Sequence, residues 1–158
     1  MISKDAADYC LLNQQELFSR SPEETHSLAK DFSKVLLPGD LVTLKGNLGA
    51  GKTTFVKALI HYLCGVNPDE ISSPTFTYLN IYNTTPTVNH FDFYRITSEE
   101  QAIQLGLDEH INDYSIALVE WPERAPSIVK KPSYEVEIFY LGQTERAIKI
   151  KSLKNEKT

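Results

Sequence analysis

The feature that most constrains this chain of 158 residues is a glycine-rich loop over residues 46–53. The run Leu41–Leu44 before it is aliphatic and β-branched, which predicts a short strand, and a helical pattern follows from about Lys52 to Leu63. The loop fits the phosphate-loop pattern G-x-x-x-x-G-K-[ST] without a mismatch and reads Gly46-Asn47-Leu48-Gly49-Ala50-Gly51-Lys52-Thr53. Strand, loop and helix in this order are the context that separates a phosphate-binding loop from an ordinary glycine turn.

Each residue type in this loop has a chemical reason to be there. Glycines let backbone N–H groups turn inward around a phosphate, and the positive end of the helix dipole points at the same anion. Lys52 is predicted to reach the β- and γ-phosphates and to serve catalysis, and the Thr53 hydroxyl is predicted to hold Mg²⁺. The expected nucleotide contacts are Asn47, Leu48, Gly49, Ala50, Gly51, Lys52, Thr53 and Thr54.

A second metal ligand is predicted at Glu120. This residue ends the run Ile116–Val119, whose continuous apolar character is typical of a central strand buried on both faces. Nucleotide hydrolases usually place an acidic residue at such a position to hold the metal or its waters. Because the chain lacks the guanine-reading pattern Asn-Lys-x-Asp, ATP is favoured over GTP as the nucleotide that accompanies Mg²⁺.

The remaining patterns predict an α/β fold. A helix is expected to begin after Ser21, to include Val35 and Leu36 on its apolar face, and to stop at Pro38-Gly39. Further along, the patterns predict an antiparallel pair, a short acidic helix and two late strands, at Phe76–Tyr82, Val88–Tyr94, Ser98–Leu105, Tyr134–Tyr140 and Ala147–Ile150. We expect a three-layer, P-loop NTPase-like domain with a mixed, mostly parallel central sheet and an antiparallel hairpin.

Composition narrows the class of protein. At this length and ordinary globular usage we expect one domain over residues 1–158, with flexible ends at 1–10 and 152–158. The net charge of −5 argues against tight binding to nucleic acid by the whole molecule. Two cysteines without a C-x-x-C pair, and an N-terminus without a signal-peptide pattern, predict a cytoplasmic protein that does not enter a membrane.

Several segments together resemble one family, the small bacterial ATPase of tRNA threonylcarbamoyladenosine biosynthesis, or TsaE/YjeE family. Three segments after the phosphate loop make the resemblance specific: Ser73-Pro74-Thr75-Phe76, His90-Phe91-Asp92-Phe93-Tyr94-Arg95 and Val119-Glu120-Trp121-Pro122-Glu123. Other matching segments are Ser21-Pro22-Glu23-Glu24-Thr25, Pro38-Gly39-Asp40 and Leu105-Gly106-Leu107. The loop departs from the family pattern at Asn47, where the family usually has an aspartate.

The resemblance implies a Mg²⁺-dependent ATPase that turns over slowly alone and supports the threonylcarbamoyl transfer complex, which modifies ANN-decoding tRNA. Partners would be the transferase subunits, with tRNA contacted only indirectly. Thr75 resembles a switch threonine that senses the γ-phosphate or its Mg²⁺. Asp92 resembles the residue that orients the attacking water, with His90 beside it. Trp121, Tyr94 and Arg95 are further candidates for nucleotide or partner contacts.

Two other functions stay open at this stage. A small-molecule or nucleoside kinase could use the same loop, although only four arginines are available and no paired lid arginines are evident. A nucleotide-gated binding module that never hydrolyses its ligand would also show the same motifs. Release of phosphate from ATP without an acceptor separates the ATPase from the kinase. Dependence of turnover on an added cell fraction separates it from the binding module.

Overall fold

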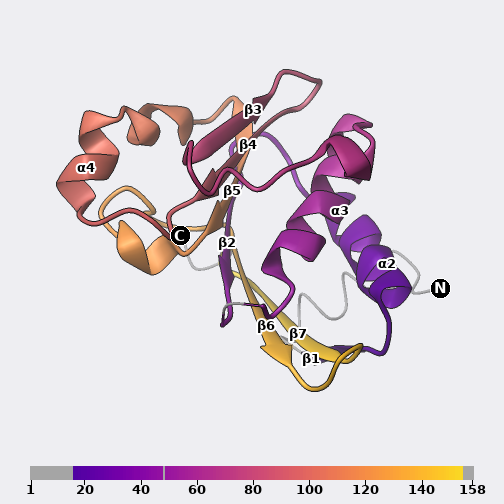
Figure 1. Ribbon diagram of the computed structural model, residues 1–158. Coiled ribbons are helices and arrows are strands. Elements are labelled where there is room, and N and C mark those ends of the chain that lie inside the picture. The colour runs from indigo at the N-terminus through magenta and orange to yellow at the C-terminus, as the bar shows by residue number, and fades with distance from the viewer. Residues whose placement is uncertain (1–15, 48, 155–158) are drawn as a thin grey trace.

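The computed structural model describes residues 16–47 and 49–154, and its strands form one seven-stranded sheet (Figure 1). The strands are β1 (Glu16–Ser19), β2 (Leu41–Lys45), β3 (Leu79–Tyr82), β4 (Thr87–Asp92), β5 (Ser115–Glu120), β6 (Tyr134–Tyr140) and β7 (Arg146–Ser152). The α-helices are α2 (Pro22–Ser33), α3 (Lys52–Cys64) and α4 (Glu99–Gln104). Short 3₁₀ turns are η1 (Pro68–Glu70), η2 (Leu107–His110) and η3 (Pro122–Arg124).

The sheet has the strand order β1-β7-β6-β2-β5-β4-β3. Its four middle strands, β6, β2, β5 and β4, run parallel, whereas β1, β7 and β3 join in antiparallel pairings at the two sides. The mixed sheet with an antiparallel hairpin is therefore confirmed, and its parallel part is confined to the middle. This arrangement brings the carboxyl ends of β2, β4 and β5 to one edge, where ligands of such sheets bind.

Three layers are present, because α2 and α3 cover one face of the sheet and α4 lies over the other (Figure 1). Phe32 of α2 stacks on Phe55 of α3, with ring centroids 6.2 Å apart, and both belong to the larger core cluster. The second cluster joins Phe91 and Phe93 to Ala102 of α4 on the opposite face. Packing on both faces explains why β5 is buried along its whole length.

Several predicted boundaries were wrong for local reasons. The first helix ends at Ser33, since the N–H groups of Val35 and Leu36 bond three residues back to Phe32 and Ser33 in a tighter turn. The predicted strand Phe76–Tyr82 is shortened to β3, because a turn closed by Tyr78 N–H to Pro74 O, at 2.7 Å, occupies its first half. Strand β4 ends at Asp92 rather than Tyr94. Strand β1 was not predicted.

The two ends predicted to be flexible differ in what can be described. Residues 1–10 lie outside the described residues. At the other end, Ser152 closes β7, and Lys154 Nζ pairs with Asp40 Oδ1 at 2.9 Å, so the first three residues of that expected end are held in the fold. None of the helices in the described ranges has the length and apolar character needed to span a bilayer.

Candidate functional site

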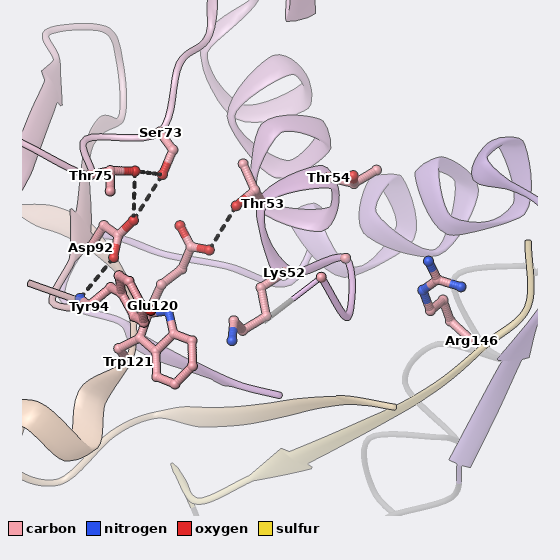
Figure 2. Close-up of a pocket in the computed structure, with 12 residues that line it drawn as sticks. Lys52, Thr53, Thr54, Ser73, Thr75, Asp92, Tyr94, Glu120, Trp121 and Arg146 are labelled. Carbon is pink, nitrogen blue, oxygen red and sulfur yellow. Dashed lines mark hydrogen bonds between the residues drawn. The ribbon is translucent and has the colours of Figure 1, made fainter. Parts of the chain in front are cut away.

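A pocket of about 400 Å³ opens at the edge where the parallel strands end (Figure 2). The phosphate loop, the start of α3, the ends of β4 and β5, and the segment after η1 all contribute to its walls. The lining residues are Gly49, Gly51, Lys52, Thr53, Thr54, Ser73, Thr75, Asp92, Tyr94, Glu120, Trp121 and Arg146. The pocket therefore brings together Lys52, Thr53, Thr75, Asp92 and Glu120, which lie far apart in the sequence.

Lys52 is a buried cation of this pocket, whose lining also includes Arg146. Its ammonium donates to the Gly46 carbonyl and lies 3.7 Å from the centroid of the Trp121 ring. Burial lowers the pKa of Lys52 below its ordinary value, while the negative charges of Glu120, Glu123 and Asp92 oppose that shift. The Lys52 ammonium is therefore partly desolvated, and nearby carboxylates favour its charged form. A phosphate that enters the pocket would contact this ammonium.

Glu120 is 2% exposed, and both of its carboxylate oxygens have partners. The Thr53 hydroxyl donates to Oε1 at 3.1 Å, and His90 Nε2 lies 2.7 Å from Oε2. A buried carboxylate requires such partners, because its charge loses most of its hydration. The two predicted metal ligands, Thr53 and Glu120, are thus in direct contact across the pocket.

Asp92 organises a second group of polar side chains beside Glu120. Its Oδ2 atom accepts hydrogen bonds from the hydroxyls of Ser73 at 3.0 Å and Thr75 at 3.3 Å, and its Oδ1 atom accepts from Tyr94 N–H at 3.0 Å. Figure 2 shows these side chains converging on the Asp92 carboxylate. The segment that carries Thr75 is therefore tied to the end of β4.

Arg146 of β7 supports the phosphate loop from the other side. Its Nε donates to the Ala50 carbonyl at 2.9 Å, and its Nη1 donates to Gly142 at 2.6 Å. Gly51, Thr54 and Arg146 also line a neighbouring pocket of about 80 Å³ between α2 and the β6–β7 turn. The space beside the phosphate loop thus extends past Thr54, away from Glu120.

Most of the predicted site residues line the larger pocket, but some do not. Lys52, Thr53, Thr54, Gly49 and Gly51 line the larger pocket, together with the predicted Thr75, Asp92 and Glu120. Asn47 and Ala50 are not among the lining residues, and they form a backbone turn in which Ala50 N–H donates to the Asn47 carbonyl at 2.9 Å. Leu48 lies outside the described residues.

Two pocket residues carried no functional expectation of their own. Ser73 shares the Ser-Pro-Thr-Phe segment with Thr75, and its place two residues away was the available signal. Arg146 had no such signal, since its contact with Ala50 depends on the pairing of β7 with β6. The interaction of His90 with Glu120 likewise depends on the register of β4 and β5.

A glycine-rich loop between a central parallel strand and a helix, with a lysine and a threonine at the helix start, defines the class of P-loop folds. Within that class, the family model described as "Threonylcarbamoyl adenosine biosynthesis protein TsaE" matches residues 19–148. The chain therefore belongs to the TsaE family.

Individual relatives agree with this assignment. A protein of Rickettsia typhi named tRNA threonylcarbamoyladenosine biosynthesis protein TsaE is 42% identical over 133 residues, which cover 83% of this chain and 90% of the relative. The protein of that name from Bacillus subtilis is 37% identical, covering 85% of this chain and 84% of the relative. The crystal structure of Bacillus subtilis YdiB superposes with a TM-score of 0.73 at 31% identity, covering 90% of this chain and 87% of that one.

The first prediction concerns the geometry of the phosphate loop. A Cβ at Gly46 would lie 2.6 Å from the Ile138 carbonyl oxygen, whereas a Cβ at Gly49 would meet nothing within 4 Å, although both residues have positive φ. We expect Gly46→Ala to lower the free energy of unfolding by ~3 kcal/mol or more and Gly49→Ala by only ~1 kcal/mol, since only the first adds a backbone clash to the strain. Urea unfolding of both variants measures this, and equal losses would contradict it.

Proposed function

We propose that the chain is a Mg²⁺-dependent ATPase that supports threonylcarbamoyl transfer in the modification of ANN-decoding tRNA to N6-threonylcarbamoyladenosine. The observation that carries this proposal is the convergence of Lys52, Thr53, Glu120, Asp92 and Thr75 on one pocket beside the phosphate loop. A lysine, two carboxylates and two hydroxyls are the groups that a P-loop NTPase requires for phosphate, metal and water. The names of the relatives support the place in tRNA modification.

Binding of the triphosphate begins at the phosphate loop. The N-terminal end of α3 directs its free N–H groups and the positive end of its dipole at the pocket. Lys52 would exchange its contacts with Gly46 O and the Trp121 ring for the β- and γ-phosphates. The smaller pocket beyond Thr54 gives room for a further part of the nucleotide on the side away from Glu120.

The residues at the metal position fit magnesium. Mg²⁺ prefers oxygen ligands and is usually held by one or two protein groups together with phosphates and waters. Thr53 Oγ1 and Glu120 Oε1 are both oxygens, lie 3.1 Å apart, and face the pocket. When bound, the ion would supply charge stabilisation at the β- and γ-phosphate oxygens. We assign Thr53 and Glu120 as its protein ligands.

Asp92 is the residue we assign to orient the attacking water. Its three hydrogen-bond donors fix the orientation of the carboxylate. A carboxylate can accept about four hydrogen bonds, so it has capacity left for one from a water. Thr75 contacts Asp92 through a single side-chain hydroxyl, and that contact can be exchanged for one with the γ-phosphate. Nucleotide binding would then move the segment that carries Thr75.

The proposed partners follow from charge and family. A chain with a net charge of −5 has little capacity to neutralise tRNA phosphates, so tRNA recognition is assigned to other proteins. We propose that these are the threonylcarbamoyl transferase subunits and that the chain acts with them in the cytoplasm. Hydrolysis by this chain would drive their cycle rather than perform the transfer itself.

Lys52→Ala tests the nucleotide site. Removing the ammonium should lower kcat/KM for ATP hydrolysis by at least ~100-fold, because no other lysine lines the pocket. The matched control is Lys57→Ala, which removes the same charge from the same helix without touching the pocket. Phosphate release is measured without any acceptor, and a requirement for an acceptor would instead indicate a kinase.

The roles assigned to Asp92 and Thr53 predict different effects of their substitution on catalysis and on nucleotide binding. Asp92→Asn should lower kcat by roughly 100-fold with little change in ATP affinity, since it impairs the orientation of water. Thr53→Ala should weaken the Mg²⁺-dependent part of nucleotide binding, since it removes a metal ligand. Calorimetric titration with and without Mg²⁺ is combined with steady-state kinetics. Equal loss of binding in both variants would show that the roles are assigned wrongly.

Coupling to partners is tested by co-elution. The purified chain should co-elute with the threonylcarbamoyl transferase subunits to an extent that differs between ATP, ADP and no nucleotide, because the Thr75 segment changes its contacts with the bound ligand. Lys52→Ala serves as the control that should remove the nucleotide dependence. Identical elution in all three states would contradict the coupling while leaving the ATPase assignment standing.

A further inference from the structure

His90 is a buried histidine with no part in the proposed chemistry. It lies on β4 with none of its surface exposed, two residues before Asp92 and on the same face of the sheet. Its Nε2 atom is 2.7 Å from Glu120 Oε2. Its Nδ1 atom is buried and has no hydrogen-bond partner among the described residues. The only polar contact described for the ring is therefore the one with Glu120.

The direction of this hydrogen bond follows from the partners of Glu120. The ionised carboxylate can only accept hydrogen bonds. Thr53 donates to Oε1. We assign His90 Nε2 as the donor to Oε2, because an ionised carboxylate has no proton to give.

The two donors hold opposite ends of the carboxylate. His90 approaches Oε2 from within the sheet, whereas Thr53 approaches Oε1 from the start of α3 beside the phosphate loop. With Oε2 restrained, Oε1 is the oxygen left to face the pocket. Hydrogen bonds behind a metal-binding side chain orient that side chain in just this manner, and their loss typically costs 10- to 100-fold in metal affinity.

We propose that His90 is a positioning residue that fixes the Glu120 carboxylate so that Oε1 faces the metal position beside Thr53. This inference rests on the proposed function for its consequence, since the metal is the Mg²⁺ of the nucleotide site. The restraint of Glu120 by a hydrogen-bond donor on β4 does not itself require a ligand. A histidine that merely fills space would have no such effect on Glu120.

Two substitutions separate the donor from the bulk of the ring. His90→Gln carries its amide nitrogen at about the reach of Nε2 and should still donate to Glu120. His90→Asn carries the same amide one carbon short, near the position of Nδ1, and should not. If His90→Asn does not fold, His90→Leu replaces it, because it removes the donor without burying another polar group. Val88→Ala is the stability control, since Val88 is buried on the same face of β4 and packs in the core.

The first measurement is nucleotide binding by calorimetry with and without Mg²⁺. His90→Asn should weaken the Mg²⁺-dependent part by about 10- to 100-fold and leave Mg²⁺-free binding close to that of the wild type. His90→Gln should recover most of the loss, and Val88→Ala should show none. Unchanged Mg²⁺ dependence in His90→Asn, or an equal loss in Val88→Ala, would overturn the proposal.

The second measurement needs no nucleotide. In crystal structures of the ligand-free variants, Glu120 Oε1 should keep its contact with Thr53 in His90→Gln and lose it in the variant without a donor. A carboxylate that stays in place without the donor would overturn the proposal. If the wild-type chain binds no nucleotide, the proposed function fails and these structures alone decide the role of His90.

Discussion

A buried negative charge is the constraint on which the rest of the site depends. Glu120 ends a strand covered on both faces, so its carboxylate must find its partners within the protein. These partners come from two different elements, His90 on β4 and Thr53 at the start of α3. The hydrogen bonds of the Glu120 carboxylate thus connect the start of α3 to the central strands of the sheet.

The register of β4 and β5 creates a second electrostatic problem. Asp92 and Glu120 are directly paired neighbours, which places two carboxylates side by side at the same edge. Their donors are separate, since Asp92 accepts from Ser73, Thr75 and the backbone of Tyr94. Burial lowers the pKa of Lys52, and the negative charges of Glu120 and Asp92 oppose this shift. Two carboxylates with different donors can serve two different roles in one pocket.

The sequence was sufficient to predict the parts of the site that are local in the chain. The phosphate loop, the helix from Lys52 and the strand before Glu120 were predicted because their residue types and spacing report the local backbone directly. The contacts of Arg146 and His90 could not be predicted, since they depend on which strands pair and in what register. The turn at Tyr78 was not predicted, because the β-branched and aromatic residues there favour a strand. The same segment carries Thr75, whose hydroxyl contacts Asp92.

The same contacts describe what a ligand has to replace. Lys52 contacts the Gly46 carbonyl and the Trp121 ring, Thr53 contacts Glu120, and Thr75 contacts Asp92. Each of these side chains thus already has an internal partner, so its contribution to nucleotide affinity is the difference between two sets of contacts. Trp121 precedes η3 and has a positive φ of 57°. Phe76, one residue after Thr75, is 76% exposed with Arg95 over its ring at 4.3 Å. Under the proposed function, an exchange of contacts inside the pocket would act on these two segments and, through them, on the surface that meets the proposed partner proteins.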